Sequence, residues 1–344
     1  MQFIKPGINI DFIGKRKIAF VLSLAMILIS IGSLLINKGP RYGIDFAGGT
    51  LVQVKFESSV TIDQIKSGLA TMELAASAVQ QFGQAHDHEY LIRTDAADPA
   101  MEGLSENIEK SLKEATHVPV EIRRVEMVGP QVGQDLREKA LFAMFYALLL
   151  ITVYISGRFE LKWAISGIVA AAIMGAVYLL SLFHVSVPFL MLAALIVSLV
   201  IFWFFEFKYA MGAIVALIHD VTITVGMFSI FDKEFTLPII AALLTIIGYS
   251  LNDTIIVFDR IRENLRKYHK EPLGTILNKS INETLSRTIL TSGTTLIVVV
   301  ALFILGGGII HDFSFALLVG ILVGTYSSIF VASPILMAWQ TRRK

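Results

Sequence analysis

The chain has 344 residues, of which 55% are hydrophobic and only 17% are charged. Soluble domains are typically about 45–50% apolar and about 25% charged, so this balance excludes a disordered chain and a coiled coil. The formal net charge of +1 gives no overall electrostatic attraction for a nucleic-acid backbone. The sequence has no cysteine, which excludes thiol catalysis, cysteine-ligated metals and disulfides.

The hydrophobic residues fall in blocks that are long enough to cross a bilayer, which takes about 20 apolar residues per helix. These blocks predict a polytopic α-helical membrane protein with about eight transmembrane helices. They cover residues 18–36, 139–156, 163–183, 187–205, 209–231, 237–257, 288–307 and 313–338. The first block is longer than the apolar part of a usual signal peptide, and no small-residue cleavage site clearly follows it. We therefore interpret it as an uncleaved helix.

Lysine and arginine residues indicate the orientation, because short cytoplasmic loops carry an excess of them. If the eight spans alternate, the basic residues of the N-terminus, the 258–286 segment and the C-terminal tail lie on one side. Lys233 is the only lysine or arginine in the short opposite loops. We therefore expect both termini in the cytoplasm and residues 37–136 in the periplasm.

This pattern divides the chain into spans, loops and one soluble domain. The parts are a cytoplasmic N-terminus (1–17), a first span (18–36), a periplasmic domain (37–136), a second span (137–158), an inserted hairpin (159–205), a polar hairpin (206–257), a cytoplasmic amphipathic segment (258–286), two final spans (287–338) and a basic cytoplasmic tail (339–344). On the amphipathic segment we expect Asp259, Arg260 and Glu263 to pair on an interfacial helix.

The periplasmic domain alternates short strands with helices. A strand over 50–56 is followed by a helix capped by Thr61, strands over 76–83 and 89–94, a helix over 99–115 capped by Asp98, and a strand over 120–127. The order βαββαβ predicts a ferredoxin-like α+β domain. Residues 86–89 (HDHE) form a tight cluster of possible ligands, but a metal needs further ligands from elsewhere, so we predict no metal site.

Ionisable groups inside a span are energetically costly, so each one is a candidate functional residue. The candidates are His219, Asp220, Asn252, Asp253, Thr254 and Arg287, with the hydroxyl run Thr288, Thr291, Ser292, Thr294 and Thr295. A buried carboxylate next to an arginine and hydroxyls can take and release a proton, because burial and the cation act on it in opposite directions. For Asp253 and Arg287 the alternative is a static ion pair, and for Asp220 it is simple pairing with His219.

Four motifs identify a family resemblance. They are residues 43–50 (GIDFAGGT), 128–133 (VGPQVG), 248–254 (GYSLNDT) continuing through 258–264 (FDRIREN), and 286–288 (SRT) with 291–295 (TSGTT). Together, in this order, they resemble the SecD/SecF family of protein-export membrane proteins, which belongs with the RND-type transporters.

The resemblance implies a SecF-type subunit that pairs with SecD and works with the SecYEG channel, often accompanied by YajC. Such a pair uses the proton gradient, or sodium in some relatives, to draw an unfolded preprotein across the bacterial cytoplasmic membrane. The family's coupling aspartate and arginine match Asp253 and Arg287. Supporting intramembrane groups would be His219, Asp220, Asn252, Thr254, Thr291, Ser292, Thr294 and Thr295. We expect no cofactor, no bond-making catalysis and no nucleic-acid partner, only membrane lipids around the spans.

The inserted hairpin departs from the six spans that are usual for SecF-type members of the family. Residues 159–164 (FELKWA) echo 205–210 (FEFKYA), which indicates a duplicated hairpin. The copy has lost the polar groups, since Phe202 and Trp203 stand where the other copy has Asn252 and Asp253. The hairpin therefore cannot relay protons at these positions. We expect it to face lipid or to pack against SecD or another partner, and neutral drift after duplication is the alternative.

Two functions of other classes remain open at this point. One is a non-conducting scaffold subunit that only stabilises the translocon. The other is an RND-type exporter of small molecules, which is disfavoured by the single small external domain and by the absence of a second homologous half in this sequence.

Overall fold

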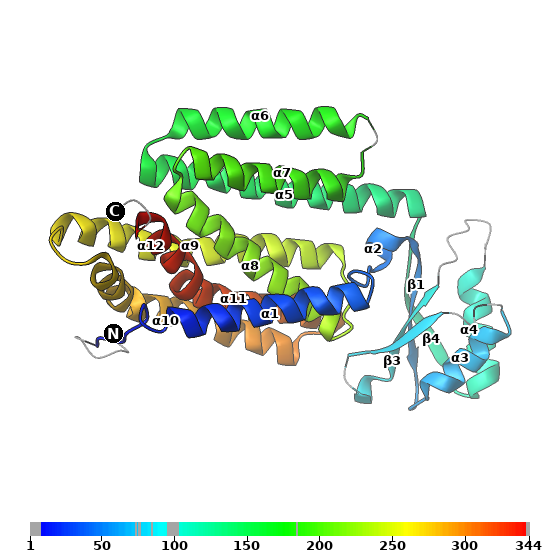
Figure 1. Ribbon diagram of the computed structural model, residues 1–344. Coiled ribbons are helices and arrows are strands. Elements are labelled where there is room, and N and C mark those ends of the chain that lie inside the picture. The colour runs from blue at the N-terminus through cyan, green and yellow to red at the C-terminus, as the bar shows by residue number, and fades with distance from the viewer. Residues whose placement is uncertain are drawn as a thin grey trace.

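A computed structural model describes residues 8–72, 74, 77–83, 85–94, 103–183 and 185–341. In Figure 1 the long helices lie side by side in one body, and a small sheet with two helices lies beyond one end of that body. Eight helices of the described chain are long and apolar enough to cross a membrane. The predicted multi-pass membrane protein with a small α+β domain is confirmed.

The first seven spans are single long helices, and the eighth is interrupted. The seven are α1 (Arg16–Ile36), α5 (Pro130–Glu160), α6 (Trp163–Ser181), α7 (Val187–Phe204), α8 (Lys208–Ile230), α9 (Leu237–Lys267) and α10 (Leu273–Leu305). The eighth consists of α11 (Gly308–Ser327), a π-helical turn (Ser328–Ala332) and α12 (Ser333–Thr341). Pro334 accounts for the turn, because a proline ring clashes with the carbonyl four residues earlier and an extra residue per turn relieves the clash.

The helices extend beyond the apolar blocks that predicted them. In particular, α9 continues to Lys267 and α10 begins at Leu273, so residues 258–286 are extensions of two spans rather than a separate interfacial helix. Polar contacts hold the extensions together: the Asn264 amide donates to Ser280 Oγ at 3.0 Å and to a Glu283 oxygen at 2.8 Å. Hydropathy could not indicate these contacts, because the residues that make them are polar.

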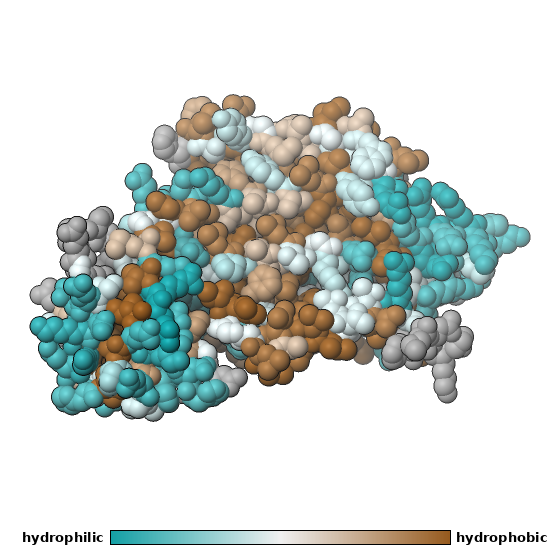
Figure 2. All heavy atoms as spheres, turned by 180° about the vertical axis from the view of Figure 1, so that it is seen from behind, coloured by the Kyte–Doolittle hydropathy of each residue, from teal (hydrophilic) through white to brown (hydrophobic). Residues whose placement is uncertain are grey.

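The outside of the helical body is apolar. Figure 2 shows a broad hydrophobic band between two hydrophilic ends, one of which is the small domain. In the most apolar part of α1 only 17% of the residues are buried inside the protein, although its mean hydropathy is 2.6. An apolar helix that its own chain leaves uncovered is typical of a surface that faces lipid or a partner protein.

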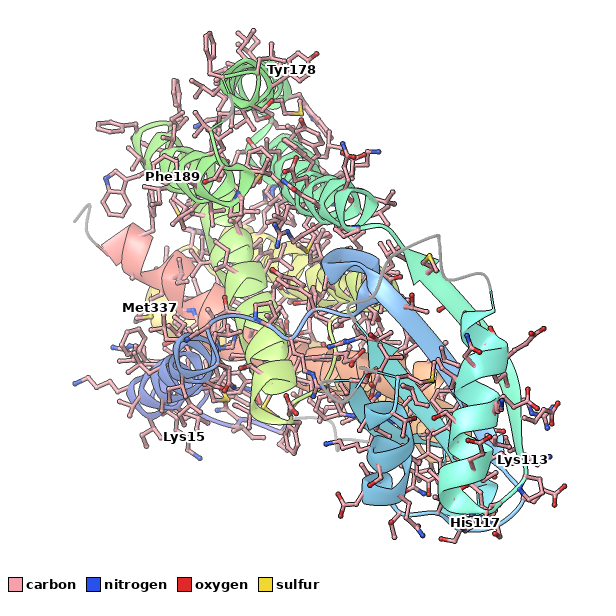
Figure 3. The ribbon with its side chains drawn as sticks, turned by 90° about the vertical axis from the view of Figure 1, so that its right-hand side faces the viewer. Lys15, Lys113, His117, Tyr178, Phe189 and Met337 are labelled. Carbon is pink, nitrogen blue, oxygen red and sulfur yellow. The ribbon has the colours of Figure 1, made fainter. Side chains whose placement is uncertain are left out.

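The inserted hairpin forms one edge of the helical body. Helix α6 packs on α5 and α7, and α7 also contacts α5 and α8. Figure 3 shows α6 and α7 on the side away from α1, with Tyr178 and Phe189 labelled; these residues are 60% and 63% exposed. The hairpin therefore presents one of its faces to the surroundings of the molecule.

The small domain contains a four-stranded antiparallel sheet in the order β2-β3-β1-β4, which is the ferredoxin-like arrangement that the sequence predicted. Its elements are β1 (Gly49–Phe56), α3 (Ile62–Ala70), β2 (Ala78–Phe82), a 3-10 turn (Ala85–Asp87), β3 (Glu89–Thr94), α4 (Leu104–Thr116) and β4 (Val120–Val128), preceded by a single helical turn, α2 (Ile44–Ala47). The predicted N-cap of α3 is confirmed, because Thr61 and Gln64 form a reciprocal capping box. The predicted cap at Asp98 lies outside the described residues.

One face of this sheet carries the domain core. Alternating residues of β1, namely Val52, Val54 and Phe56, are buried against the two helices. Helix α4 contributes Leu112, which is fully buried and belongs to the same cluster. The opposite face of the sheet is turned toward the helical body, so a single layer of helices closes the core.

Replacing Leu112 with alanine should therefore loosen the domain. A buried leucine truncated to alanine typically loses about 2–5 kcal/mol of stability. Hydrogen exchange of the β1 amides in the full chain should report a loss of this size for Leu112→Ala. The matched control is Val125→Ala on β4, where the side chain is 42% exposed and the loss should be small. Equal losses for both variants would contradict the assigned core.

Candidate functional site

A buried polar layer crosses the helical body, and Asp220 on α8 lies at its centre. Asp220 is 0% exposed. One carboxylate oxygen, Oδ1, lies 2.9 Å from Nδ1 of His219. The other, Oδ2, accepts hydrogen bonds from Ser250 on α9 at 2.6 Å and from Ser327 on α11 at 2.8 Å. Both oxygens are thus engaged, and the carboxylate joins three spans.

His219 connects this layer to the first helix. Its Nε2 lies 3.2 Å from the Ser23 hydroxyl on α1, which lies 3.1 Å from the Tyr326 hydroxyl on α11. Tyr326 in turn donates to the carbonyl oxygen of Ala19 at 2.7 Å. The sequence-based alternative for Asp220, pairing with His219, therefore describes its contacts, and the pair is part of a wider network that holds α1 against α8 and α11.

Asp253 on α9 has fewer partners. It is 1% exposed, and its Oδ2 accepts one hydrogen bond, from Ser292 on α10 at 3.2 Å. The Ser292 hydroxyl also accepts from Thr325 on α11 at 2.8 Å. Oδ1 of Asp253 is buried without a hydrogen-bond partner among the described residues, as is the Thr288 hydroxyl. A buried polar atom without a partner is destabilising, so this carboxylate is poised to gain a proton or a new partner.

The structure does not bring Arg287 to Asp253 as an ion pair. Arg287 is exposed on α10, whereas Ser292 is buried. Five residues of helix rotate a side chain by about 140°, so Arg287 and Ser292 face different sides of α10. In this arrangement one hydroxyl group, that of Ser292, and not a cation contacts Asp253.

The other predicted polar residues divide by burial. Thr254 is buried next to Asp253, whereas Asn252 is exposed. On α10, Thr291 and Thr294 donate to backbone carbonyls one turn earlier, at 2.8 and 2.9 Å. Thr295 accepts from the Tyr249 hydroxyl of α9 at 3.2 Å. Thr295 therefore contributes to the contact between α9 and α10, whereas Thr291 and Thr294 form hydrogen bonds within their own helix.

Sequence reasoning missed the residues that complete the layer. These are Ser23, Ser250, Thr325, Tyr326 and Ser327. Single hydroxyl residues are common in membrane helices, where small side chains favour close packing, so none of them stands out alone. The one usable signal was spacing, because Ser250 precedes Asp253 by one helical turn and therefore lies on the same side of α9.

Small residues on α11 allow the layer to form. A Cβ added to Gly324 would lie 2.9 Å from the Cβ of Ser250, and one added to Gly320 would lie 2.4 Å from Ile246. Both glycines are therefore contact points at which α11 approaches α9 closely. This approach places Ser327 and Ser250 on the same carboxylate oxygen of Asp220.

Substituting Gly324 by valine should force α11 away from α9. The expected result is loss of the Ser250 and Ser327 contacts with Asp220 and a thermal transition lowered by several degrees in lipid or detergent. Gly293→Val on α10 is the matched control, because nothing lies within 4 Å of a Cβ at that position. The packing account fails if the two variants melt at the same temperature.

A second polar cluster joins the small domain to the helical body. The Gly43 N–H donates to the Phe235 carbonyl at 2.9 Å, and the Phe235 N–H donates to the Arg41 carbonyl at 2.7 Å. Glu234, in the loop between α8 and α9, pairs with Arg93 of β3 at 2.7 Å. A cavity of about 760 Å³ lies between the sheet and the loop ends of the bundle. The domain is thus fastened through backbone and charged contacts around an open space.

Two of the sequence motifs meet at this junction. Gly48 has a φ of +79°, and a Cβ there would lie 2.8 Å from the Cα of Pro130. A Cβ on Gly133 would lie 3.0 Å from the Gly48 nitrogen. Gly48 and Gly133 are therefore required for the close approach of the chain just before β1 to the start of α5.

Acidity should strengthen this junction. Burial raises the pKa of Glu234 above its ordinary value of 4.5, and the nearby Asp312 carboxylate adds to the rise, while the Arg93 and Arg41 guanidinium groups oppose it. The docked state then binds the proton more tightly than an undocked state, so docking weakens as the pH rises from about 4.5 through the raised pKa. Glu234→Gln should remove this dependence.

Spin labels can measure this change, since the natural chain has no cysteine. Labels attached after Lys113→Cys on α4 and Leu305→Cys at the end of α10 report the distance between the domain and the body. The docked population should fall with rising pH in the labelled chain and stay constant after Glu234→Gln. An identical pH profile in both would exclude Glu234 as its source.

Comparisons with known proteins place these features in a family context. The chain matches the family model for the C-terminal part of the protein export membrane proteins SecD/SecF over residues 107–197 and 174–342, and the model of the SecD/SecF GG motif over residues 33–60. The first model thus matches twice, in overlapping ranges that include the inserted hairpin.

Similar full-length proteins and a solved structure were also found. The chain is 43% identical over 350 residues to the protein translocase subunit SecF of Magnetococcus marinus, covering 100% of this chain and 97% of that protein. It is 40% identical over 348 residues to the same subunit of Calditerrivibrio nitroreducens, covering 100% and 98%. The crystal structure of SecDF from Thermus thermophilus, a translocon-associated membrane protein, matches with a TM-score of 0.72 and 30% identity. That match covers 99% of this chain but 40% of the SecDF chain.

Proposed function

The chain belongs to the SecD/SecF family of protein-export membrane proteins, and on that premise we propose that it is a SecF-type subunit of a protein translocase. It is a transport subunit and not an enzyme. Because it corresponds to 40% of the SecDF chain, a SecD subunit supplies the remainder of the working unit. The unit acts with the SecYEG channel, accompanied by YajC, on an unfolded preprotein in a bacterial cytoplasmic membrane.

The proposed orientation places both termini in the cytoplasm and the ferredoxin-like domain in the periplasm. Basic residues support it, since Arg158, Lys162, Lys208 and the turn between α9 and α10 all lie at helix ends on the side away from the small domain. In the short loops at the end next to the small domain, Lys233 is the only lysine or arginine. A membrane protein with this asymmetry keeps its basic loops in the cytoplasm.

We propose that Asp253 couples proton movement to export. The supporting observation is the half-satisfied carboxylate: Oδ2 has one hydroxyl donor and Oδ1 has none among the described residues. A proton on Asp253 removes the buried charge, and release of that proton demands a counter-charge, which Arg287 supplies when its side chain turns inward. Asp220 is held by three polar partners and keeps the surrounding spans in register. Neither residue requires a bound cofactor.

Replacing Asp253 with asparagine tests this role with little change of shape. In inverted membrane vesicles, stimulation of preprotein export by the proton gradient should fall to the level of vesicles that lack the chain. Asp259→Asn is the matched control on the same helix, because Asp259 forms a half-exposed ion pair with Arg158 and should leave export unchanged.

Export that stays gradient-stimulated in Asp253→Asn vesicles would overturn the coupling role and favour a scaffold subunit. Repeating the assay with a sodium gradient in place of the proton gradient identifies the driving ion. Transport of a small molecule by the same vesicles, without preprotein, would favour the RND-type exporter instead.

A further inference from the structure

A chain of hydroxyl groups leads from Asp253 to the backbone of α11. The Ser292 hydroxyl donates to Asp253 Oδ2 at 3.2 Å, and the Thr325 hydroxyl donates to Ser292 Oγ at 2.8 Å. Thr325 Oγ1 also lies 2.8 Å from the carbonyl oxygen of Ile321, one helical turn earlier on α11. The chain therefore joins α9, α10 and α11, and it ends on a main-chain oxygen.

The Thr325 hydroxyl has more acceptors than it can serve at once. A hydroxyl group has one proton to donate, and its oxygen can accept in return. The two acceptors of Thr325, which are Ser292 Oγ and the Ile321 carbonyl, lie at the same distance of 2.8 Å. One of them receives the proton at a time. The geometry therefore permits two arrangements of the chain, and distance favours neither.

Ser327, which reaches the other buried carboxylate, is not balanced in this way. Its Oγ lies 2.8 Å from Asp220 Oδ2 but 3.1 Å from the Gly324 carbonyl. Asp220 Oδ2 also accepts from Ser250, so this carboxylate keeps a second hydroxyl donor whichever way Ser327 turns. The two hydroxyl groups of α11 therefore differ, and the one linked to Asp253 is poised between its acceptors.

The charge on Asp253 selects between the two arrangements. An ionised carboxylate only accepts, so Ser292 donates to it and accepts from Thr325. A carboxyl group protonated at Oδ2 donates to Ser292 Oγ instead. The Ser292 proton then turns to Thr325, and the Thr325 proton turns to the Ile321 carbonyl. Each hydroxyl keeps its own proton and only rotates, so the single proton gained is the one on Asp253.

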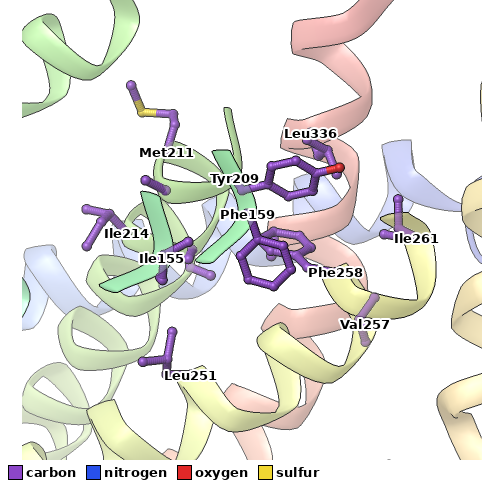
Figure 4. Packing of buried hydrophobic residues seen from close by; sticks show 14 of the residues in the cluster. Ile155, Phe159, Tyr209, Met211, Ile214, Leu251, Val257, Phe258, Ile261 and Leu336 are labelled. Atoms are coloured by element: carbon purple, nitrogen blue, oxygen red, sulfur yellow. The ribbon is translucent and has the colours of Figure 1, made fainter. Parts of the chain in front are cut away.

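Asp253 has apolar neighbours on its own helix. Val257, one turn farther along the same side of α9, is 1% exposed and belongs to the main hydrophobic cluster. Figure 4 shows it in that cluster together with Leu251. Oδ1 of Asp253 has no hydrogen-bond partner among the described residues, so a proton is best held on Oδ2, next to Ser292. Apolar side chains neither donate nor accept, and a change of charge at Asp253 is therefore passed to the hydroxyl groups.

The far end of the chain acts on the shape of α11. A threonine hydroxyl that donates to the carbonyl four residues earlier competes with the helix hydrogen bond there and often bends the helix. Release of the Ile321 carbonyl relieves that bend. This part of α11 is sensitive to bending, because Ser327 donates to Asp220 and the π-helical turn begins at Ser328.

We propose that Thr325 is a positioning residue for the coupling reaction, and that its hydroxyl converts the charge of Asp253 into the bend of α11. An ionised Asp253 draws the Thr325 proton toward Ser292, and a protonated Asp253 sends it to the Ile321 carbonyl. The inference rests on proton exchange at Asp253, which is the proposed function. It adds the helix that responds to that exchange.

The test has to separate Asp253 from other charged groups on the helices packed against α9. Arg287 acts on Asp253 electrostatically, although its side chain is exposed. The full set is Arg287 and Glu283 on α10, His219 and Asp220 on α8, His311 and Asp312 at the start of α11, and Arg158 and Glu160 at the end of α5. Comparison with Asp253→Asn isolates the contribution of Asp253, because this variant leaves all of these groups in place.

Solid-state NMR of the full chain in lipid tests the proposal at the Ile321 carbonyl. Isoleucine labelled with carbon-13 at its carbonyl and leucine labelled with nitrogen-15 select each isoleucine that precedes a leucine, as Ile321 precedes Leu322. The variant Ile321→Val identifies the signal, because it removes the label and keeps the carbonyl. The signal should move downfield from alkaline to acidic buffer, since the carbonyl gains a hydrogen bond.

The movement of this signal should be lost in Asp253→Asn and in Thr325→Val. It should be kept in Thr325→Ser, which retains the hydroxyl group. Thr245→Val is the matched control, because Thr245 on α9 is exposed and donates to the Ala241 carbonyl one turn earlier at 2.8 Å. This variant loses the same kind of bond and should leave the response of Ile321 unchanged.

Two results would overturn the proposal, and they can be told apart. If infrared spectra show that Asp253 gains and loses a proton while the Ile321 signal does not move, the role of Thr325 is wrong and the coupling role of Asp253 stands. If Asp253 does not change its protonation at all, both are wrong. The response of the unmodified chain decides the matter even if Thr325→Val does not fold.

Discussion

The burial of two carboxylates inside an apolar helical body is the constraint on which the rest of this structure depends. A charged or polar group in such a place is destabilising unless hydrogen bonds satisfy it. Asp220 receives its partners from α8, α9 and α11, whereas Asp253 receives one hydroxyl. One carboxylate is therefore a junction of helices, and we propose that the other is the group whose protonation changes.

This division depends on how closely the helices approach one another. Gly320 and Gly324 let α11 touch α9, and Gly226 brings α8 against Ser30 of α1. Glycines also permit close contact at the junction with the small domain, where Gly48 and Gly133 allow the start of the sheet to approach the start of α5 closely. Asp253 and the junction are connected by one helix, because α9 begins at Leu237, directly after the loop that carries Glu234.

Much of this architecture could be predicted from the sequence, because the signals were local. Apolar blocks indicated eight spans, and alternation with a capping residue at Thr61 indicated the ferredoxin-like domain. Helix ends were missed where polar residues continue a helix, as on α9 to Lys267, since hydropathy does not report interhelical hydrogen bonds such as that of Asn264. The contact of Asp220 with Ser327 was missed because more than a hundred residues separate them and a single serine is not unusual in a membrane helix. The exposure of Arg287 depends on the rotation of α10, which its neighbours in space determine.

The central claim is that Asp253, and not Asp220, is the carboxylate that exchanges a proton. Infrared difference spectroscopy of the chain in lipid, between acidic and alkaline buffer, measures this most directly through the stretch of a buried protonated carboxyl group. The account predicts a band that disappears in Asp253→Asn and persists in Asp220→Asn. A band that persists in Asp253→Asn and is lost in Asp220→Asn would contradict it.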